Sequence, residues 1–312
     1  MRVSSSMMFD AAVTGINQQM SSLVHLQEQI SANKRILTPS DDPVAAARAI
    51  EVQQSLDTSN QFTTNQKSAT SALDQEDSVL GSASDIIGQI RDLAIQAEDP
   101  TLTAANRQSI ATSVRSLFSN LQGVANSTDG AGNYLFSGYQ GKTQPFSGDV
   151  DTMNNTPPSV GSEISYKGDD GQRTMQIAPS RYIAVSDSGS DVFMRTGNGE
   201  SVFKTIATLV SKLEGPMPAT YSADLNTAVS RLGQANSHVV DVRASVGSRG
   251  DEVTTTGSMT NDLTLQYTTQ LSSLQDLDMV KALTQQTQIQ TNLTAAEKSF
   301  ATVSQLSLFT YL

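Results

Sequence analysis

The chain has 312 residues, with 31 Asp and Glu against 20 Lys and Arg, which gives a formal net charge of -11 at pH 7. It contains no cysteine and only two histidines, so disulfides, thiol nucleophiles and Cys/His zinc sites are excluded. So acidic a chain is also a poor binder of nucleic acid or anionic lipid, because both need clustered Lys and Arg.

The first predicted element is an amphipathic helix within residues 7–37. Apolar residues recur there at alternating steps of three and four, which keeps them on one face of a helix. We call this face the amino-terminal seam, and its members are Phe9, Val13, Ile16, Met20, Leu23, Ile30 and Leu37. No neighbouring domain is available to cover it. We therefore expect the helix to be disordered in the monomer and to fold as a coiled coil when other copies supply a groove.

Two long helices are predicted on either side of a central insertion, within residues 43–98 and 222–274. Apart from Pro43, both ranges lack proline, which permits long uninterrupted helices. Asp42 is suited to cap the first of them, with Pro43 in its first turn, and a shorter helix is expected to begin at Thr103. At 1.5 Å per residue each long helix would extend about 80 Å, so we expect the two to pack as an antiparallel hairpin.

Between the long helices, glycine, proline and aromatic residues concentrate, which marks residues 134–205 as a separate domain. Aromatic residues are only 5% of the chain, so one compact aromatic core is not expected. Alternating apolar residues at 164–166 and 175–177 flank a Gly-Asp-Asp-Gly turn at 168–171, and we predict that they pair as a β-hairpin. Another strand is predicted at 182–185.

The last predicted helix runs from Met279 toward the chain end and carries a second apolar face. We call it the carboxyl-terminal seam, and its members are Ile289, Leu293, Ala296, Phe300, Val303, Leu306, Leu308 and Phe309. Like the first seam, it lacks a domain to pack against, so self-assembly is the favoured interpretation. The alternative is that the two terminal helices pack together within one molecule and complete an ordinary bundle.

These elements predict a mainly α fold with a β insertion, in which the two flanks form a long antiparallel coiled-coil or helical-bundle rod. Residues 1–42 and 276–312 would be terminal assembly helices. Residues 43–133 and 206–275 would form the helical rod domain, and residues 134–205 a small β-rich outer domain.

Side chains that could support catalysis are few. His25 and His238 fall on predicted helices with no nucleophile beside them and are interpreted as solvent-facing or groove-edge histidines. The acidic pairs Asp41-Asp42 and Asp169-Asp170 fit a helix cap and a turn, and Asp276 with Asp278 fits a polar break between helices. No phosphate-binding glycine loop or metal-ligand spacing is present. We therefore expect neither an enzyme nor a bound cofactor or metal.

From the sequence we expect neither a membrane span nor a cleavable secretory signal. No apolar run approaches the ~20 residues that cross a bilayer, so no membrane insertion is expected. Asp10 interrupts the apolar core that a cleavable secretory signal would need. Export by a route that reads an uncleaved, unfolded amino terminus stays possible.

Two short motifs carry a family resemblance. After the basic pair at 34–35, Thr38-Pro39-Ser40-Asp41-Asp42-Pro43 is similar to the PSDDP segment of the hook-associated branch of the flagellin superfamily. The sequence STDGAGNYLFSGY at 127–139 is similar to its TDGxGxYxFxGY segment, and Asp276-Leu277-Asp278 before the final helix also fits. Filament flagellins usually carry a lysine-containing, proline-free form of the first segment. Pro39 and Pro43 therefore favour the junction proteins of this branch.

The resemblance implies a structural adaptor of the bacterial flagellum that lies between hook and filament. It implies export in an unfolded state through the flagellar type III system, and hence a secreted, extracellular location. The implied partners are neighbouring copies of the chain, the type 1 hook-associated protein, flagellin and an export chaperone that holds the carboxyl-terminal helix. Neither nucleic acid nor a membrane is among them.

Three other interpretations stay open at this stage. A flagellin or minor filament subunit would share the same motifs and would polymerise into long filaments. A helical signalling hairpin like the cytoplasmic domain of a chemoreceptor is also rich in Ala and Gln, but it requires a membrane anchor or a linked receptor domain. An enzyme carried by the insertion is the least favoured, because titratable side chains are scarce.

Overall fold

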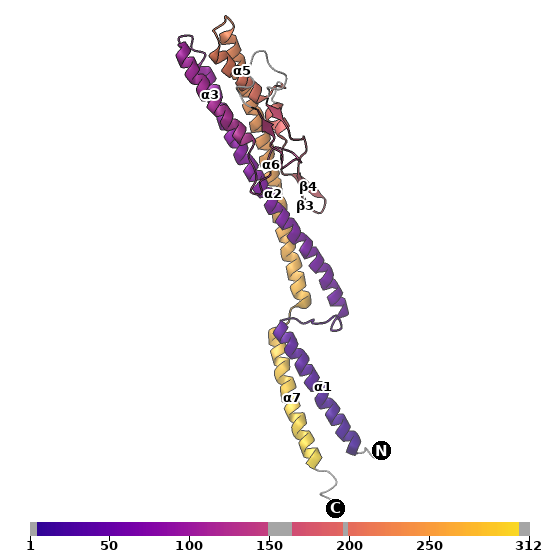
Figure 1. The fold of residues 1–312 in the computed structure, drawn as a ribbon. Helices are drawn as coiled ribbons and strands as arrows, with labels where there is room; N and C mark the ends of the chain where they lie inside the picture. Colours follow the sequence, from indigo (N-terminus) through magenta and orange to yellow (C-terminus); the bar gives the residue numbers. More distant parts are fainter. Residues whose placement is uncertain (1–4, 149–163, 196–198, 306–312) are drawn as a thin grey trace, which may run out of the picture. The chain divides into compact units, whose positions relative to one another are not determined.

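The computed structural model describes residues 5–148, 164–195 and 199–305, and most of these residues are helical (Figure 1). The helices in chain order are α1 Ser5–Ala32, α2 Pro43–Gln96, α3 Ala104–Ala125, α5 Val202–Glu214, α6 Tyr221–Gln275 and α7 Met279–Gln305, with one π-helical turn, η1 Ser190–Met194, before α5. The predicted mainly α fold with a small β insertion is confirmed.

The chain divides into two compact units. One comprises the described parts of Met1–Ser59 and Asp262–Leu312, and the other those of Asn60–Asn261. We call them the terminal unit and the central unit. Because α2 and α6 are long, each contributes residues to both. The domain limits expected from the sequence follow the helix ends instead, and they stay a prediction.

Side-chain caps help to set the starts of α2 and α3. Asp42 Oδ1 accepts the backbone N–H of Ala45 at 3.0 Å, and Thr103 Oγ1 accepts that of Asn106 at 3.2 Å. Each cap satisfies an amide that has no partner inside its helix, so both predicted N-caps are confirmed.

The first helix ends before the last residue predicted for its seam. α1 ends at Ala32, and Asn33 adopts a left-handed backbone with φ of 52°. Asparagine tolerates this conformation better than most residues and commonly ends helices in this way. Leu37 therefore lies in the loop after α1 and not on the helix face predicted for it.

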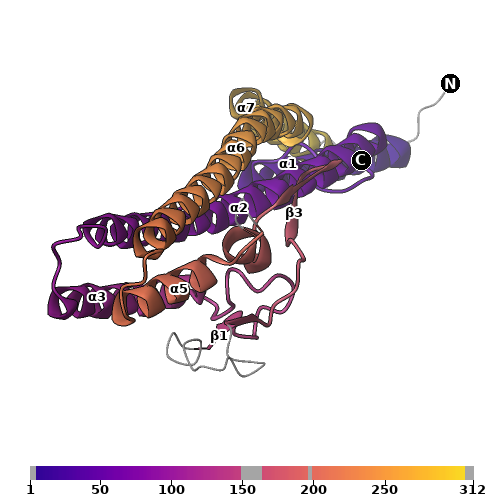
Figure 2. The same cartoon turned by 90° about the horizontal axis from the view of Figure 1, so that it is seen from above.

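In the central unit, α2 and α6 are antiparallel. Earlier residues of α2 contact later residues of α6. Gln66 Nε2 donates to Thr260 Oγ1 at 2.9 Å. Further along α2, Asp77 Oδ1 accepts Arg243 Nε at 2.9 Å and Ser84 Oγ donates to Asn236 Oδ1 at 2.7 Å. The antiparallel hairpin predicted from the equal helix lengths is confirmed. α3 and α5 pack side by side next to this pair (Figure 2).

The core of the central unit combines the helix seams with a cluster of phenylalanine rings. Phe118, Phe136, Phe146, Phe193 and Phe203 are all fully buried. Phe146 lies at the centre, with its ring centroid 5.2 Å from that of Phe203 and 5.5 Å from that of Phe193. The expectation of no compact aromatic core was wrong here. The few aromatic residues are concentrated around the insertion, and folding gathers them between α3, α5 and η1.

The described part of the insertion contains two small antiparallel sheets. β1 Phe146–Ser147 pairs with β2 Ser165–Tyr166, and β3 Thr174–Ala178 pairs with β4 Arg181–Ala184. The strand predicted at 182–185 is thus confirmed.

The predicted pairing of 164–166 with 175–177 was wrong, because Asp169 in the turn between them binds a different part of the chain. Asp169 Oδ1 accepts the N–H groups of Tyr139 and Gly171, both at 2.9 Å. Asp169 therefore fastens the turn to a loop from the start of the insertion, and the segments on its two sides pair with different strands.

Candidate assembly surface

The two terminal helices pack against each other in the terminal unit (Figure 1). The rings of Phe9 in α1 and Phe300 in α7 have centroids 4.6 Å apart. Leu26 in α1 and Ala282 in α7 are the buried apolar side chains among the described residues of this pair. The arrangement corresponds to the intramolecular pairing that the alternative interpretation expected.

Pairing leaves both seams incompletely covered. Phe9 is 44% exposed, Val13 37% and Met20 52%. The other seam residues whose side chains are described are half-buried, namely Ile16, Leu23, Ile30, Leu37, Ile289, Leu293, Ala296 and Phe300. Val303 lies in α7, whereas Leu306, Leu308 and Phe309 lie outside the described residues. One pair of helices thus offers an apolar face that a further helix could cover.

A groove of about 360 Å³ lies between α1 and α7. Its walls come from both seams and include Phe9, Ile16, Ala296 and Phe300. Gly15 also lines it, and the absence of a side chain there leaves room for a close approach. A groove with apolar walls is the kind of surface that accepts an amphipathic helix.

The two aspartates of the first motif form hydrogen bonds within the loop between α1 and α2 and at the start of α2. Asp41 Oδ2 accepts the N–H groups of Leu37 and Thr38, both at 2.9 Å. The bonds from Thr38 and Leu37 hold the pKa of the Asp41 carboxyl below its usual value. The cap bond from Ala45, and after it Arg35, lower the pKa of Asp42 in the same way. Both carboxylates therefore act in shaping the loop and starting α2.

Arg35 joins this loop to the turn between α6 and α7. Its backbone N–H donates to Gln275 O at 2.7 Å, and its Nη2 donates to Leu274 O at 2.8 Å. Its Nη1 donates to Asp42 Oδ2 at 3.1 Å. The last carbonyls of a helix have no intrahelical donor and carry partial negative charge, so a guanidinium suits this position. Sequence reasoning noted the basic pair at 34–35 but gave Arg35 no role.

Arg35→Ala is expected to loosen the carboxyl end of α6. The side chain is partly exposed, so its loss should cost only about 1 kcal/mol, which raises amide hydrogen exchange of residues 272–277 roughly fivefold. Mass spectrometry of the intact chain measures this exchange. Arg48→Ala, which removes an exposed arginine of α2, is the matched control and should leave exchange there unchanged. Equal exchange in the two variants would contradict the assigned role.

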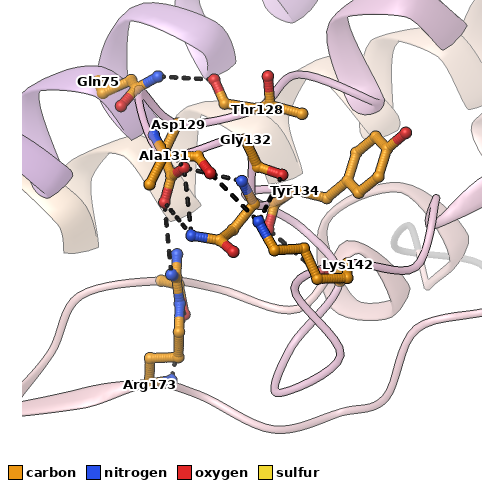
Figure 3. Close-up of polar contacts among 11 residues, drawn as sticks. Gln75, Thr128, Asp129, Ala131, Gly132, Tyr134, Lys142 and Arg173 are labelled. Carbon is orange, nitrogen blue, oxygen red and sulfur yellow. Dashed lines mark hydrogen bonds and ion pairs between the residues drawn. The ribbon is translucent and has the colours of Figure 1, made fainter.

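The second motif forms a hydrogen-bonded loop at the start of the insertion (Figure 3). Asp129 Oδ1 accepts the N–H groups of Ala131 at 2.9 Å and Asn133 at 2.8 Å. Gly132 has a φ of 73°, a conformation that suits glycine. Gln75 Nε2 of α2 donates to the Thr128 carbonyl at 3.0 Å and ties the loop to the helix. The motif therefore serves to attach the insertion to α2.

The candidate catalytic residues are not assembled into a site. His25 Nε2 lies 3.7 Å from Asp41 Oδ1, and His238 Nε2 lies 2.8 Å from the backbone oxygen of Asp191. Neither contact includes the hydroxyl group of a serine or threonine. Over residues 5–148, 164–195 and 199–305, no group of three or more His, Asp or Glu side chains could hold a metal ion. In the same residues, no helix is both long and apolar enough to cross a membrane.

Comparison with known proteins shows that the chain is similar to flagellar proteins. Residues 3–141 match the family model of the bacterial flagellin N-terminal helical region. Flagellar hook-associated protein 3 of Escherichia coli K12 is 29% identical over 327 aligned positions, and that of Salmonella typhimurium LT2 is 28% identical, each alignment covering 99% of both chains. The crystal structure of the flagellar junction protein FlgL of Legionella pneumophila has a TM-score of 0.61 at 20% identity, covering 73% of this chain and 100% of that one.

Proposed function

We propose that this chain, which is similar over its whole length to flagellar hook-associated protein 3, is a structural adaptor that joins the flagellar hook to the flagellin filament. The observation that carries this function is the alignment over 99% of both chains with relatives of that name. The two motifs at 38–43 and 127–139 agree with it. A flagellin or minor filament subunit is not favoured, because these relatives are hook-associated proteins.

The terminal helices are proposed as the assembly elements. The amino-terminal and carboxyl-terminal seams are half-covered by their own pairing, and the groove between them has apolar walls. Burying such surface against neighbouring copies stabilises an assembly by roughly 25 cal/mol for each Å² covered. In this scheme the helices α1 and α7, which lie within the proposed assembly segments 1–42 and 276–312, pack as a coiled coil with those of neighbouring copies. The rod domain of 43–133 and 206–275 and the outer domain of 134–205 form the rest of the proposed adaptor.

The proposed partners follow from the position of the adaptor. The type 1 hook-associated protein would contact it on the hook side, flagellin on the filament side, and sister copies laterally. The chain would leave the cell unfolded through the flagellar type III system, accompanied by an export chaperone on its carboxyl-terminal helix. The absence of cysteine agrees with this route, since no disulfide has to be opened before passage.

A deletion strain tests the function. Cells that lack the gene are expected to keep intact hooks, to carry no attached filaments and to release flagellin into the medium, and the gene supplied in trans should restore filaments. Electron microscopy and immunoblots of the medium measure both results. Normal filaments on the deletion strain would overturn the proposal.

Polymerisation in vitro separates the adaptor from a flagellin. The purified chain, added to isolated hook ends, should stop at a short collar. A flagellin would instead grow long filaments under the same conditions, and that outcome would favour the filament-subunit interpretation.

A further inference from the structure

Glu76 is a buried acid that the assembly role does not use. It lies on the apolar face of α2 between Leu73 and Leu80, and its side chain is only 2% exposed. Its Oε1 accepts the backbone N–H of Asp187 at 2.8 Å. Its Oε2 is buried and has no hydrogen-bond partner among the described residues. A carboxylate left half-paired in a core is costly, so this position calls for an explanation.

Three parts of the chain meet at Glu76. Asp187 belongs to the segment after β4, and its Oδ2 pairs with Arg249 Nη2 from α6. Asp187 Oδ1 accepts Gln172 Nε2 at 2.9 Å, and Arg249 Nη1 donates to the Ala184 carbonyl at 3.1 Å. The contact therefore fastens the segment at 184–189 to both long helices.

The charged groups around Glu76 are one acid, Asp187, and two arginines that pair with other acids. Asp187 is the other acid in the contact, and Arg249 is already paired with it. Arg173, also from the insertion, is the second cation near Glu76, and its Nη1 lies 3.9 Å from Asp129 Oδ2 (Figure 3). Ionised Glu76 would add a second negative charge beside Asp187, with one oxygen away from water. Protonated Glu76 keeps its bond from Asp187 without that repulsion.

We propose that Glu76 is a proton-dependent latch, which holds the segment at 184–189 against α2 and α6 when protonated and loosens it when ionised. The latch does not rest on the proposed adaptor function, because all of its parts lie within the central unit. Burial, and after it the charge of Asp187, raise the pKa of Glu76 to about 7, against the bond from Asp187 and the charges of Arg249 and Arg173. The switch would thus operate near neutral pH.

Neighbouring contacts confine the opening to this segment. Gln66 Nε2 donates to the Ile177 carbonyl and Asn65 Nδ2 to the Gln176 carbonyl, both at 2.8 Å, so β3 is held to α2 by uncharged groups. Inside the segment, Val185 N–H donates to Arg173 O at 2.8 Å and Gly189 N–H to Phe136 O at 3.0 Å. Hydrogen exchange of these two amides and of the Asp187 amide therefore measures the opening of the segment directly.

The sign of the pH effect follows from linkage. The pKa of Glu76 is about 7 when the segment is closed and takes the ordinary value of 4.5 when the segment is open. The closed state therefore binds more protons than the open state. The closed state therefore loses stability as the pH rises from about 4.5 to 7. Between pH 6 and pH 8 the opening constant should increase roughly tenfold.

Hydrogen exchange of the full-length chain at pH 6, 7 and 8 tests the latch. Peptides that cover 184–189 are compared between the wild type and Glu76→Gln, which keeps the acceptor for Asp187 N–H but cannot ionise. Because intrinsic exchange rates cancel in this comparison, the ratio of wild-type to variant exchange should rise roughly tenfold across the range. Glu51→Gln, on the exposed face of α2, is the matched control and should follow the wild type.

A ratio that does not change with pH would overturn the latch. A second measurement keeps the proposal testable if Glu76→Gln does not fold. In the wild type with ¹³C-labelled glutamate, one side-chain carboxyl carbon should titrate with a midpoint near 7. If every glutamate midpoint lies below about 5.5, within the ordinary spread for this residue, Glu76 ionises normally and the latch is refuted.

Discussion

Leu293→Asp is expected to abolish incorporation of the chain into the flagellum while leaving the central unit folded. Leu293 is half-buried on the carboxyl-terminal seam of α7. A carboxylate there would have to lose its water when a neighbouring helix covers the seam, which costs several kcal/mol in each contact between copies. Since every copy carries the same defect, the assembly should fail completely.

The measurement has to separate assembly from export. Purified Leu293→Asp protein is added from outside to filament-less cells that retain hooks, and filament regrowth is scored by electron microscopy. Thr294→Asp places the same charge on an exposed position of the same helix and should regrow filaments like the wild type. Phe300→Asp, which removes the ring contact with Phe9, should fail like Leu293→Asp. Normal regrowth with either seam variant would show that the carboxyl-terminal seam is not the assembly surface.

Phe203→Ala is expected to lower the free energy of unfolding of the central unit by about 3–5 kcal/mol. Phe203 is fully buried, and its ring centroid lies 5.2 Å from that of Phe146, 5.7 Å from that of Phe118 and 6.0 Å from that of Phe193. Truncation removes all three ring contacts and leaves a cavity that the helices α3 and α5 cannot close by a small shift.

Urea unfolding followed by circular dichroism measures this loss. The matched control is Phe9→Ala, because Phe9 is 44% exposed and belongs to the terminal unit. Its effect on the main unfolding transition should stay below about 1 kcal/mol. Equal losses for the two variants would contradict the assignment of the phenylalanine cluster as the core of the central unit.

Local sequence signals were sufficient to define the long helices. α2 and α6 begin and end within a few residues of the predicted ranges, and the caps by Asp42 and Thr103 are present. Apolar periodicity, capping and the absence of proline act over one or a few helical turns, so they can be read without knowing what else is nearby. The equal lengths of the two helices then predicted their antiparallel packing.

The strand pairing of the insertion could not be predicted in the same way. The residues at 164–166 and 175–177 are in extended segments, as expected, but Asp169 binds the backbone of Tyr139, which lies thirty residues earlier. A short strand can pair with any other short strand of suitable pattern, and long-range contacts choose among them. The predicted hairpin failed for this reason.

The sequence by itself determined the helix limits, the apolar periodicity of the helices and the motifs that resemble hook-associated proteins, because each depends on residues close together in the chain. Only the tertiary structure decided that α1 packs on α7, that five phenylalanines share one core, that Arg35 binds the end of α6, and that Glu76 is buried beside Asp187. Each of these depends on which distant segments meet. The free energy that selects such meetings comes from burial and pairing across the fold, and no single stretch of sequence contains it.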